Sequence, residues 1–508
     1  MATKKKQKAW VTPLVFALVI ILIAGLIVVD RLDSNGTILR SKTVLKSDNF
    51  SVSGTVMEFA VMTTYQNFVT QNQSYLQLFG LDTSKSLSSQ KYGDGTWLDF
   101  FKESTETVLS QYLVYAEAAK ADGMELSDEE LANIDRTIES MKTVAKNYGY
   151  QNLNAYLASA YGIGVKAKDV KEFYKLATLA NDYQSKIYKE IEDAVTDEDI
   201  ANEYKENPND YSFVDLISYS DSISIANDLS DAEKETLKGS LMSKFNAIAA
   251  GTDAEGIKSG IREYLEEKSM TASLTDSADT VDVEEELAKI EETLSYSGIK
   301  PTDAADWIFE NTDGVYARND GDVKVFEQYT EGGEATDSDE AKPDTYTVSI
   351  FFVAKAPYAN DKATKNVGHI LVRSDSYASD DEAKAKAEEI LAEYKAGEMT
   401  KEAFETLGEK YTEDSNVFYY NVKEGQMVTE FNDWLFDSSR QVGDVEIVKT
   451  ESYGYHIMYF DGEGERKEWQ VDCASKVVNT KSSAKSEELT KTYNVEKNES
   501  AMKAVKGK

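Results

Sequence analysis

The sequence predicts an α+β protein in which a helical region precedes two modules that mix strands with helices. The helical region is indicated by apolar residues at helical spacing, among them Leu109, Leu113 and Ala116. Beyond residue 211 the pattern changes to short apolar runs separated by helices, as mixed modules require. With 508 residues the chain is too long for one core, and its length favours about three or four domains.

One uncharged apolar run, residues 9–29, has about the ~20 residues that a helix needs to cross a bilayer. Residues 1–8 are basic and acidic residues follow the run, so the positive-inside rule predicts a cytoplasmic N-terminus. We therefore expect a single-pass anchor in the cell membrane, with the bulk of the chain extracytoplasmic. A cleaved signal peptide is the alternative, but its apolar core is normally shorter and Ala24-Gly25-Leu26 is a poor cleavage site.

The predicted helical domain covers residues 46–210. Ser127-Asp-Glu-Glu130 has the spacing of a capping box, and Thr196-Asp-Glu-Asp199 offers a related cap before the last helix. Asn207 and Pro208 then end that helix. The change of pattern at residue 211 places the domain boundary just beyond it.

A diverged internal repeat organises the rest of the chain. Ala305-Asp-Trp-Ile-Phe309, with Gly321-Asp-Val-Lys-Val325 after it, resembles Asn432-Asp-Trp-Leu-Phe436, with Gly443-Asp-Val-Glu-Ile447 after it. Each copy opens with a strand and a capped helix and ends in another strand. The repeat therefore predicts two modules of the same architecture.

The repeat sets the remaining boundaries. The first copy is assigned to residues 211–357 and the second to residues 362–462. Insertions in the first copy fall in loops, which absorb added residues at a small entropic cost. Residues 464–508 are expected to form a C-terminal helix, which packs back on the helical domain, and a polar tail without fixed structure.

Charge and cysteine content exclude several classes of function. The chain has 91 acidic and 55 basic residues, a net charge of −36, which disfavours nucleic acid as a partner. One cysteine, Cys473, excludes an internal disulfide, and together with two scattered histidines it cannot form a zinc site. Tyr161-Gly-Ile-Gly164 lacks the strand and the further glycines of a nucleotide loop. We expect no metal and no cofactor.

The two histidines, His369 and His456, both lie in the second copy, each inside a strand pattern and beside an isoleucine. An isolated histidine in such a pattern is more often an ordinary core or surface residue than a catalytic one. Their shared location in one module favours a functional pair.

The second copy resembles the parvulin family of peptidyl-prolyl isomerases. Five motifs carry the resemblance in order along the chain: Val367-Gly-His-Ile-Leu-Val372, Phe404-Glu-Thr-Leu407, Tyr411-Thr-Glu-Asp-Ser415, Gly425-Gln-Met-Val-Thr-Glu-Phe431 and Gly454-Tyr-His-Ile457. His369 and His456 match the first-strand and last-strand histidines of the family, and Asp414 matches a position that is Asp or Cys. The resemblance implies that the imidazoles hydrogen-bond to each other and that Asp414 lies near the rotating carbonyl.

The resemblance also implies substrate-binding residues. Met427 and Phe431 match the positions that line the proline pocket of the family. Tyr419 stands where an apolar pocket residue is expected, and Tyr453 replaces a small hydroxyl residue of some members. The stretch Asn416–Val422 departs from the glycine-rich segment that is usual at this place in the family.

The first copy is similar to an inactive parvulin module, because Asp215 and Ser349 are expected at its two histidine positions. One silent and one intact copy, behind a helical domain and before a terminal helix, resemble the SurA, PrsA and PpiD group of extracytoplasmic chaperones. In that group the counterpart of residues 46–210 is the N-terminal chaperone domain.

These resemblances imply a membrane-anchored foldase that binds unfolded or newly exported polypeptides and isomerises their X-Pro bonds. The alternative is a non-catalytic holdase chaperone in which both parvulin-like modules serve as binding scaffolds. A surface adhesin or sensor ectodomain accommodates the anchor and the charge but not the ordered motifs.

Overall fold

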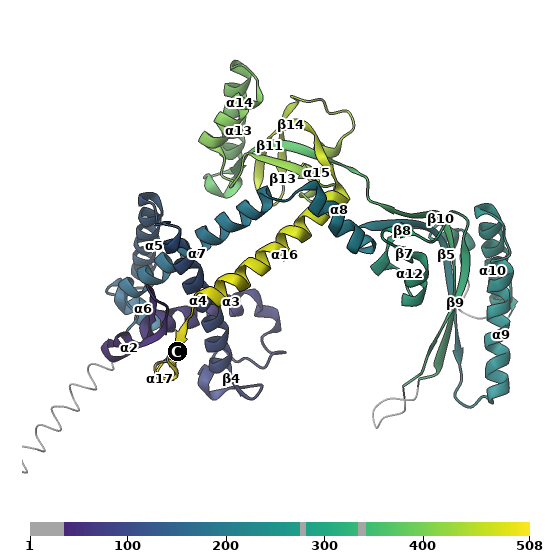
Figure 1. Ribbon diagram of the computed structural model, residues 1–508, viewed down its shortest axis with the longest axis horizontal. Coiled ribbons are helices and arrows are strands. Elements are labelled where there is room, and N and C mark those ends of the chain that lie inside the picture. The colour runs from purple at the N-terminus through teal and green to yellow at the C-terminus, as the bar shows by residue number, and fades with distance from the viewer. Residues whose placement is uncertain (1–34, 275–280, 334–341, 508) are drawn as a thin grey trace, which may run out of the picture. The chain divides into compact units, whose positions relative to one another are not determined.

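The computed structural model describes residues 35–274, 281–333 and 342–507 (Figure 1). These residues form two compact units, one holding the chain up to Ala194 and from Val478 onward, the other holding Val195–Val477. The predicted anchor, residues 9–29, lies outside the described residues. Within the described residues, no helix combines the length and the apolar character that crossing a membrane requires.

The first unit is mainly helical. Its helices are α2 (Thr37–Ser41), α3 (Gly54–Gln71), α4 (Trp97–Ala121), α5 (Asp128–Asn147), α6 (Leu153–Tyr161) and α7 (Ala167–Asp193), and a short hairpin, β3 (Lys91–Tyr92) and β4 (Gly95–Thr96), precedes α4. Leu109, Leu113 and Ala116 are buried, as their spacing predicts. The predicted capping box is present, because Ser127 Oγ accepts from Glu130 N and the Glu130 carboxylate accepts from Ser127 N.

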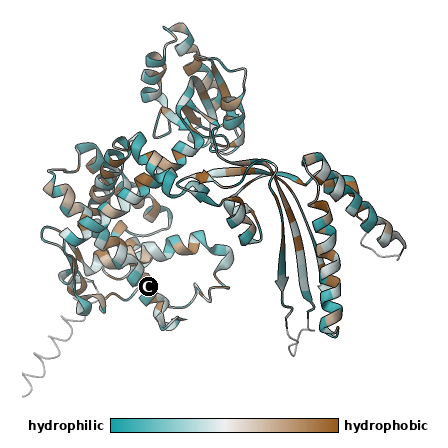
Figure 2. Cartoon of the chain, turned by 45° about the vertical axis from the view of Figure 1, so that its right-hand side comes forward, coloured by the Kyte–Doolittle hydropathy of each residue, from teal (hydrophilic) through white to brown (hydrophobic). Residues whose placement is uncertain are grey.

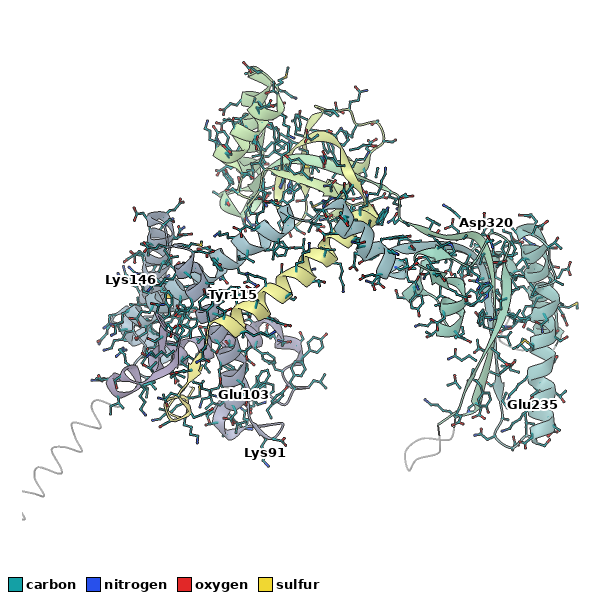
Figure 3. All side chains as sticks on the ribbon, viewed as in Figure 1. Lys91, Glu103, Tyr115, Lys146, Glu235 and Asp320 are labelled. Carbon is teal, nitrogen blue, oxygen red and sulfur yellow. The ribbon has the colours of Figure 1, made fainter. Side chains whose placement is uncertain are left out.

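Side chains divide sharply between the interior and the surface of this unit. Tyr115, on α4, lies among the packed helices and is buried, whereas Lys91, Glu103 and Lys146 are exposed at its outside (Figure 3). Trp97 and Phe101 are fully buried in the same core. The burial of large aromatic side chains supplies much of the stability of such a unit.

The C-terminal segment completes the first unit. It comprises the end of α16 (Glu468–Thr492), then β15 (Glu496–Lys497) and α17 (Glu499–Met502). β15 pairs with β1 (Thr43–Lys46), which also pairs with β2 (Ser51–Ser53). The predicted return of the terminal helix is confirmed, since Leu489 belongs to the core of the helices and Gln111 Nε2 donates to Ser486 Oγ over 3.2 Å.

The prediction of a tail without fixed structure is wrong. Met502 and Val505 are buried in the core of the first unit, and the N–H of Lys506 donates to Glu58 Oε2 over 2.9 Å. A few apolar residues are enough to order this polar segment, because pairing of β15 with β1 provides partners for its backbone groups.

The second unit contains two four-stranded antiparallel sheets of the same topology. The first has the order β6-β5-β10-β9 and the second the order β12-β11-β14-β13. The strands are β5 (Ser212–Ile225), β6 (Glu291–Ser295), β9 (Val323–Thr330), β10 (Asp344–Ala359), β11 (Ala363–Arg373), β12 (Phe418–Val422), β13 (Val445–Thr450) and β14 (Gly454–Lys467), with a small hairpin of β7 (Asn311–Thr312) and β8 (Val315–Tyr316). Figure 2 shows hydrophobic residues, in brown, along the strands of both sheets.

Three helices of each module correspond in chain order, and the short α11 of the first module has no counterpart in the second. They are α9 (Asp231–Ile248), α10 (Ala254–Leu274), α11 (Val283–Leu287) and α12 (Thr302–Ile308) in the first module, and α13 (Asp380–Ala396), α14 (Lys401–Tyr411) and α15 (Thr429–Phe436) in the second, with α8 (Asp197–Glu206) before both. Arg318 Nε donates to the carbonyl of Trp307 over 2.9 Å, and Arg440 Nε donates to the carbonyl of Trp434 over 3.2 Å. The internal repeat predicted from the sequence is therefore a structural repeat.

The strand register corrects one sequence assignment, that of Asp215 to the first histidine position of the first module. Ser218 pairs with Phe351 in the first sheet, just as His369 pairs with Met458 in the second. The N–H of Ser218 donates to Ile290 O, and that of His369 to Val417 O, both over 2.8 Å. Ser218 is thus the counterpart of His369, and Asp215, three residues away, points to the opposite face of the strand.

Each face of the second sheet packs against different helices. Ile370, Val372 and Ile457 pack with the helices α13 and α14 on one face. On the other face Val367 and Met458 pack with α15. Because side chains alternate along a strand, His369 and His456 lie on the face that α15 covers.

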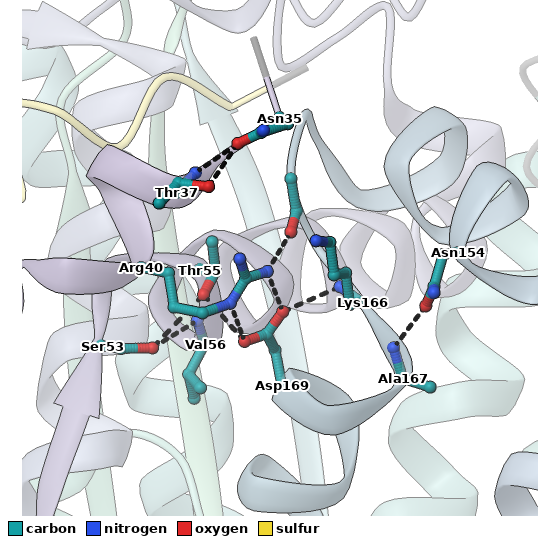
Figure 4. A network of polar contacts seen from close by, with 11 residues as sticks. Asn35, Thr37, Arg40, Ser53, Thr55, Val56, Asn154, Lys166, Ala167 and Asp169 are labelled. Carbon is teal, nitrogen blue, oxygen red and sulfur yellow. Dashed lines mark hydrogen bonds and ion pairs between the residues drawn. The ribbon is translucent and has the colours of Figure 1, made fainter. Parts of the chain in front are cut away.

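A buried ion pair ties the segment after residue 34 to α7 (Figure 4). The Arg40 guanidinium donates to both carboxylate oxygens of Asp169, over 2.9 and 2.7 Å, and also donates to the carbonyl of Gly164. Asp169 is fully buried and accepts further bonds from Thr55 Oγ1 and from the N–H of Lys166. The carboxylate is therefore saturated with donors, and Arg40 supplies its compensating charge.

Arg40→Ala is expected to destabilise the first unit by about 3 to 5 kcal/mol, because it leaves Asp169 buried without a counter-charge. Lys171→Ala, which removes the exposed ion pair with Asp135, is the matched control and is expected to cost about 1 kcal/mol or less. Hydrogen exchange of the α3 and α7 amides measures both effects on this unit alone. Equal effects of the two substitutions would contradict the account.

Candidate active site

The two histidines are cross-strand neighbours in the centre of the second sheet. His369 pairs with Met458 and His456 pairs with Leu371, so the two rings are diagonal neighbours on one face of β11 and β14. Their Nδ1 atoms lie 3.0 Å apart, and the side chains are buried, with 3% and 4% exposure of the residues. The imidazole contact that the family resemblance implies is present in the structure.

Two glycines of the histidine motifs, Gly368 and Gly454, stand where the structure leaves no room for a side chain. A Cβ at Gly368 would lie 2.8 Å from the ring of Phe418, on the neighbouring strand. Gly454 has a φ of +127°, which disfavours other residues, and a Cβ there would lie 2.6 Å from the carbonyl oxygen of Val372. These glycines let β11 approach its neighbours β12 and β14 beside the histidines.

Polar groups extend the pair at both ends. His456 Nε2 lies 3.1 Å from Thr450 Oγ1, and Thr450 is itself buried. His369 Nε2 lies 3.1 Å from Asp414 Oδ2, at ion-pair distance but without an aligned hydrogen bond. The four side chains form one line across the site: Thr450, His456, His369 and Asp414.

The line favours one set of tautomers. A carboxylate only accepts hydrogen bonds, so His369 is best placed with its proton on Nε2, facing Asp414. His369 Nδ1 then accepts from the Nδ1–H of His456, which leaves His456 Nε2 to accept from the Thr450 hydroxyl. The opposite arrangement turns the lone pair of His369 Nε2 toward the negative charge of Asp414.

Burial keeps the pair uncharged near neutral pH. Desolvation lowers the pKa of His369, although the neighbouring Asp414 opposes the change. Desolvation, followed by the proximity of His369, lowers the pKa of His456 to about 4. Both rings are therefore neutral hydrogen-bonding groups under physiological conditions.

An aromatic wall covers the pair. Phe431, on α15, stands edge-on to both imidazoles, with ring centroids 5.4 Å from His369 and 5.6 Å from His456. Tyr419, on β12, lies 5.3 Å from the His369 ring, and its hydroxyl donates to Asp414 Oδ2 over 3.3 Å. Met427 is partly buried in the same apolar cluster as Phe431. The structure thus brings these three residues to the histidine face of the sheet.

Tyr453 takes a different position. It is 45% exposed, in the turn before β14, and its carbonyl accepts from Ser374 N over 3.1 Å. No ring contact to the histidine pair is recorded for it in the described part of the chain. Its predicted role in substrate binding, like the roles of the other site residues, stays a prediction.

Sequence reasoning missed Thr450. A threonine in a strand is so common that it carries no signal of its own. The hairpin of β13 and β14 nevertheless fixes the position of Thr450. Thr450 pairs with Gly454, the residue two positions before His456. In the described residues, no group of three or more histidine, cysteine or acidic side chains is arranged to hold a metal ion.

Comparison with known proteins identifies the module. Residues 353–462 match the family described as the PPIC-type PPIASE domain. No curated protein sequence matches the chain.

Solved structures of three foldases are similar over parts of the chain. The peptidylprolyl isomerase PrsA from Bacillus anthracis is 18% identical over 29% of this chain and 63% of its own, a little under two thirds of its length, with a TM-score of 0.17. PrsA from Bacillus subtilis is 16% identical over 81% of this chain and 92% of its own, with a TM-score of 0.27. The foldase protein PrsA from Lactococcus lactis is 14% identical over 62% and 79%, with a TM-score of 0.16.

The family match covers β11, β12, β13, the first part of β14 and both histidines, and the geometry of the pair fits the motifs on which the resemblance rests. The chain therefore carries, in residues 353–462, a peptidyl-prolyl isomerase domain of the PPIC or parvulin type.

Proposed function

We propose that the protein is a membrane-anchored, extracytoplasmic foldase, which binds unfolded exported polypeptides and isomerises their X-Pro bonds at the second module. The observation that carries the proposal is the neutral imidazole pair, His369 and His456, between Asp414 and the aromatic wall of Phe431. Residues 9–29 supply the anchor by their length and apolar character.

The chemistry requires positioning rather than bond making. Rotation about the X-Pro bond must overcome a barrier of ~18 to 20 kcal/mol that comes from amide resonance. A site accelerates rotation only if it binds the twisted amide more tightly than either planar form. Phe431 and Met427 hold the proline ring, and the wall excludes water from the carbonyl, whose charge distribution changes as resonance is lost. No group in the line of four acts as a nucleophile.

Asp414 and the histidines have separate tasks in this scheme. Asp414 is the only charged member of the line, and its side chain is 32% exposed, so it faces the space where the substrate carbonyl rotates. The histidines are buried beneath it, and His369 Nε2 lies 3.1 Å from its Oδ2. Thr450 and His456 act on Asp414 only through His369, as positioning residues.

The first module is proposed to be non-catalytic. Ser218 and Ser349 stand at the histidine positions, and Ser349 Oγ accepts from Ser220 Oγ over 2.7 Å. By the alignment of Trp307 with Trp434, Ala304 takes the place of Phe431, so the module also lacks the aromatic wall. It supplies a scaffold of the same shape without the chemistry.

A separate observation in the first unit supports the binding of polypeptides, which the foldase and the holdase alternative share. Four large apolar or aromatic side chains around the β3–β4 hairpin are exposed, namely Tyr75, Leu78, Phe79 and Tyr92, with Leu78 at 80%. Exposed apolar side chains that gather in one region mark interaction surfaces. This surface suits unfolded polypeptides, and it serves the foldase and the holdase equally.

His369→Ala and His456→Ala are each expected to reduce catalysis of a proline-limited refolding reaction at least about tenfold, because each breaks the line that positions Asp414. Ser349→Ala, at the equivalent position of the first module, is the matched control and is expected to leave the rate unchanged. The measurement is the refolding rate constant at catalytic amounts of the full-length protein.

Suppression of aggregation separates the two functions. If the wild type suppresses the aggregation of an unfolded protein but accelerates no proline-limited step, the holdase alternative replaces the foldase. If both histidine variants refold the substrate as fast as the wild type, the assigned residues are not the catalytic ones.

Acidification is expected to destabilise the isomerase domain between about pH 6.5 and 4. In the unfolded chain a histidine binds a proton near pH 6.5, whereas native His456 binds one near pH 4, so the unfolded state holds more protons in this interval. The free energy of unfolding therefore falls as pH is lowered, by about 1.4 kcal/mol per pH unit for this group. Above pH 6.5 the full stability remains.

Hydrogen exchange of the β11 and β14 amides at pH 7, 6 and 5 measures this slope. His456→Gln removes the titrating group and is expected to flatten it. Proton titration of His456 near pH 6.5 in the native protein, followed by NMR, would contradict the assignment of a neutral buried pair.

The anchor has its own test. The full-length chain is expected to sediment with membranes, to resist a high-salt wash and to be released by detergent, whereas the chain without residues 1–29 is expected to stay in the soluble fraction. Protease added to intact cells without a wall should digest the bulk of the chain but spare a tag on its N-terminus. Release by salt alone would overturn the proposal of a spanning helix.

A further inference from the structure

We propose that the isomerase site prefers polypeptides with lysine or arginine next to the proline, because unpaired carboxylates border it. The preference rests on the proposed function and concerns the same site. It is carried by four acidic residues, Asp414, Glu413, Glu430 and Glu451, none of which forms an ion pair with a lysine or arginine among the described residues.

Glu430 and Glu451 form one side of this acidic rim. Glu430 directly precedes Phe431 on α15 and is exposed. Its Oε1 accepts from the N–H of Glu451 over 3.3 Å, which places the two residues side by side where the hairpin of β13 and β14 turns. Glu430 is close enough to His456 for its negative charge to act on that imidazole.

Asp414 and Glu413 form the other side. Asp414 Oδ2 contacts His369 Nε2, at 3.1 Å, and remains partly exposed. The N–H of Glu413 donates to Leu371 O over 3.0 Å, and its own Oε2 accepts from Arg373 N over 2.5 Å. Because Leu371 pairs with His456, Glu413 lies beside the strand segment that carries the site.

The Arg373 guanidinium is close enough to Glu413 for the two charges to interact, but the two side chains do not form an ion pair. In the described residues, none of the four carboxylates forms an ion pair with a lysine or arginine. The basic residues near the site are committed elsewhere, since Arg373 pairs with Asp375 at 2.9 Å and Lys449 pairs with Asp380 at 2.7 Å. The buried His369 Nε2 faces the same rim, 3.1 Å from Asp414 Oδ2. The site thus has surplus negative charge where a peptide must pass.

The geometry brings the neighbours of the proline to this charge. A proline ring that packs against Phe431 lies close to Glu430, the residue before Phe431 on α15. Neighbouring Cα atoms of the peptide are about 3.8 Å from the Cα of the proline. Lysine and arginine have long stems that let the charged group reach either side of the rim. The net charge of −36 adds a general attraction for basic segments.

The test uses four short peptides that differ only in the residue before proline, which is Arg, Lys, Gln or Glu. Cis-trans exchange is followed by NMR with the full-length protein in detergent, so that no coupling protease introduces a preference of its own. We expect kcat/KM for the Arg peptide to exceed that for the Glu peptide by about threefold to tenfold at low salt, as one or two exposed ion pairs supply. Added salt should reduce the ratio.

Two variants locate the preference. Glu430→Gln combined with Glu451→Gln is expected to bring the Arg-to-Glu ratio close to one. Glu405→Gln is the matched control, because Glu405 is exposed on α14, which packs against the opposite face of the sheet, and the ratio should remain that of the wild type.

The outcomes separate the preference from the function beneath it. If the protein accelerates none of the peptides, the proposed isomerase function itself fails. If it accelerates all four equally, or if the ratio survives the double substitution, the acidic rim does not select the substrate although the isomerase function stands.

Discussion

The antiparallel register between β11 and β14 is the constraint on which the catalytic centre depends. It sets His369 and His456 on one face of the sheet as diagonal neighbours, near enough for a contact of 3.0 Å between their Nδ1 atoms. A shift of one residue would send one ring to the face that packs on α13 and α14. Gly368 and Gly454 are compatible with this register because a side chain at either position would collide with the neighbouring strand.

The first module has the same fold but not the histidines. Its sheet has the same strand order, and the hydrogen bond from Arg318 to Trp307 repeats that from Arg440 to Trp434. At the histidine positions stand Ser218 and Ser349, and the exposed Ser220 donates its hydroxyl to the buried Ser349 Oγ. The fold is therefore maintained by its apolar layers and turns, and the chemistry by a few side chains placed on it.

Much of this organisation is predictable from the sequence because it is written in local patterns. The capping box at Ser127 and the repeated Trp motifs specify helices and modules within a few residues of themselves, and the histidine motifs specify the pair through the family they resemble. The assignment of Asp215 to the first histidine position is wrong because one strand pattern does not fix the register, which depends on pairing with two neighbouring strands. Thr450 escaped prediction although its partner His456 is only six residues away, because a threonine in a strand carries no signal of its own. The buried Met502 and Val505 escaped it because the core they enter lies far away in the sequence.

The site has a buried region, which begins at His369, and an exposed region above it, and different electrostatic effects dominate in the two. Below His369 desolvation dominates, so both imidazoles stay neutral in a strongly acidic chain and their hydrogen bonds keep a fixed direction. Above it the carboxylates of the rim are exposed to water, which screens them, and they meet the substrate first. Phe431 separates the two regions, because its ring covers the imidazoles while the residue before it, Glu430, is exposed. One helix, α15, thus sets both the apolar wall at the proline ring and the charge that its neighbours encounter.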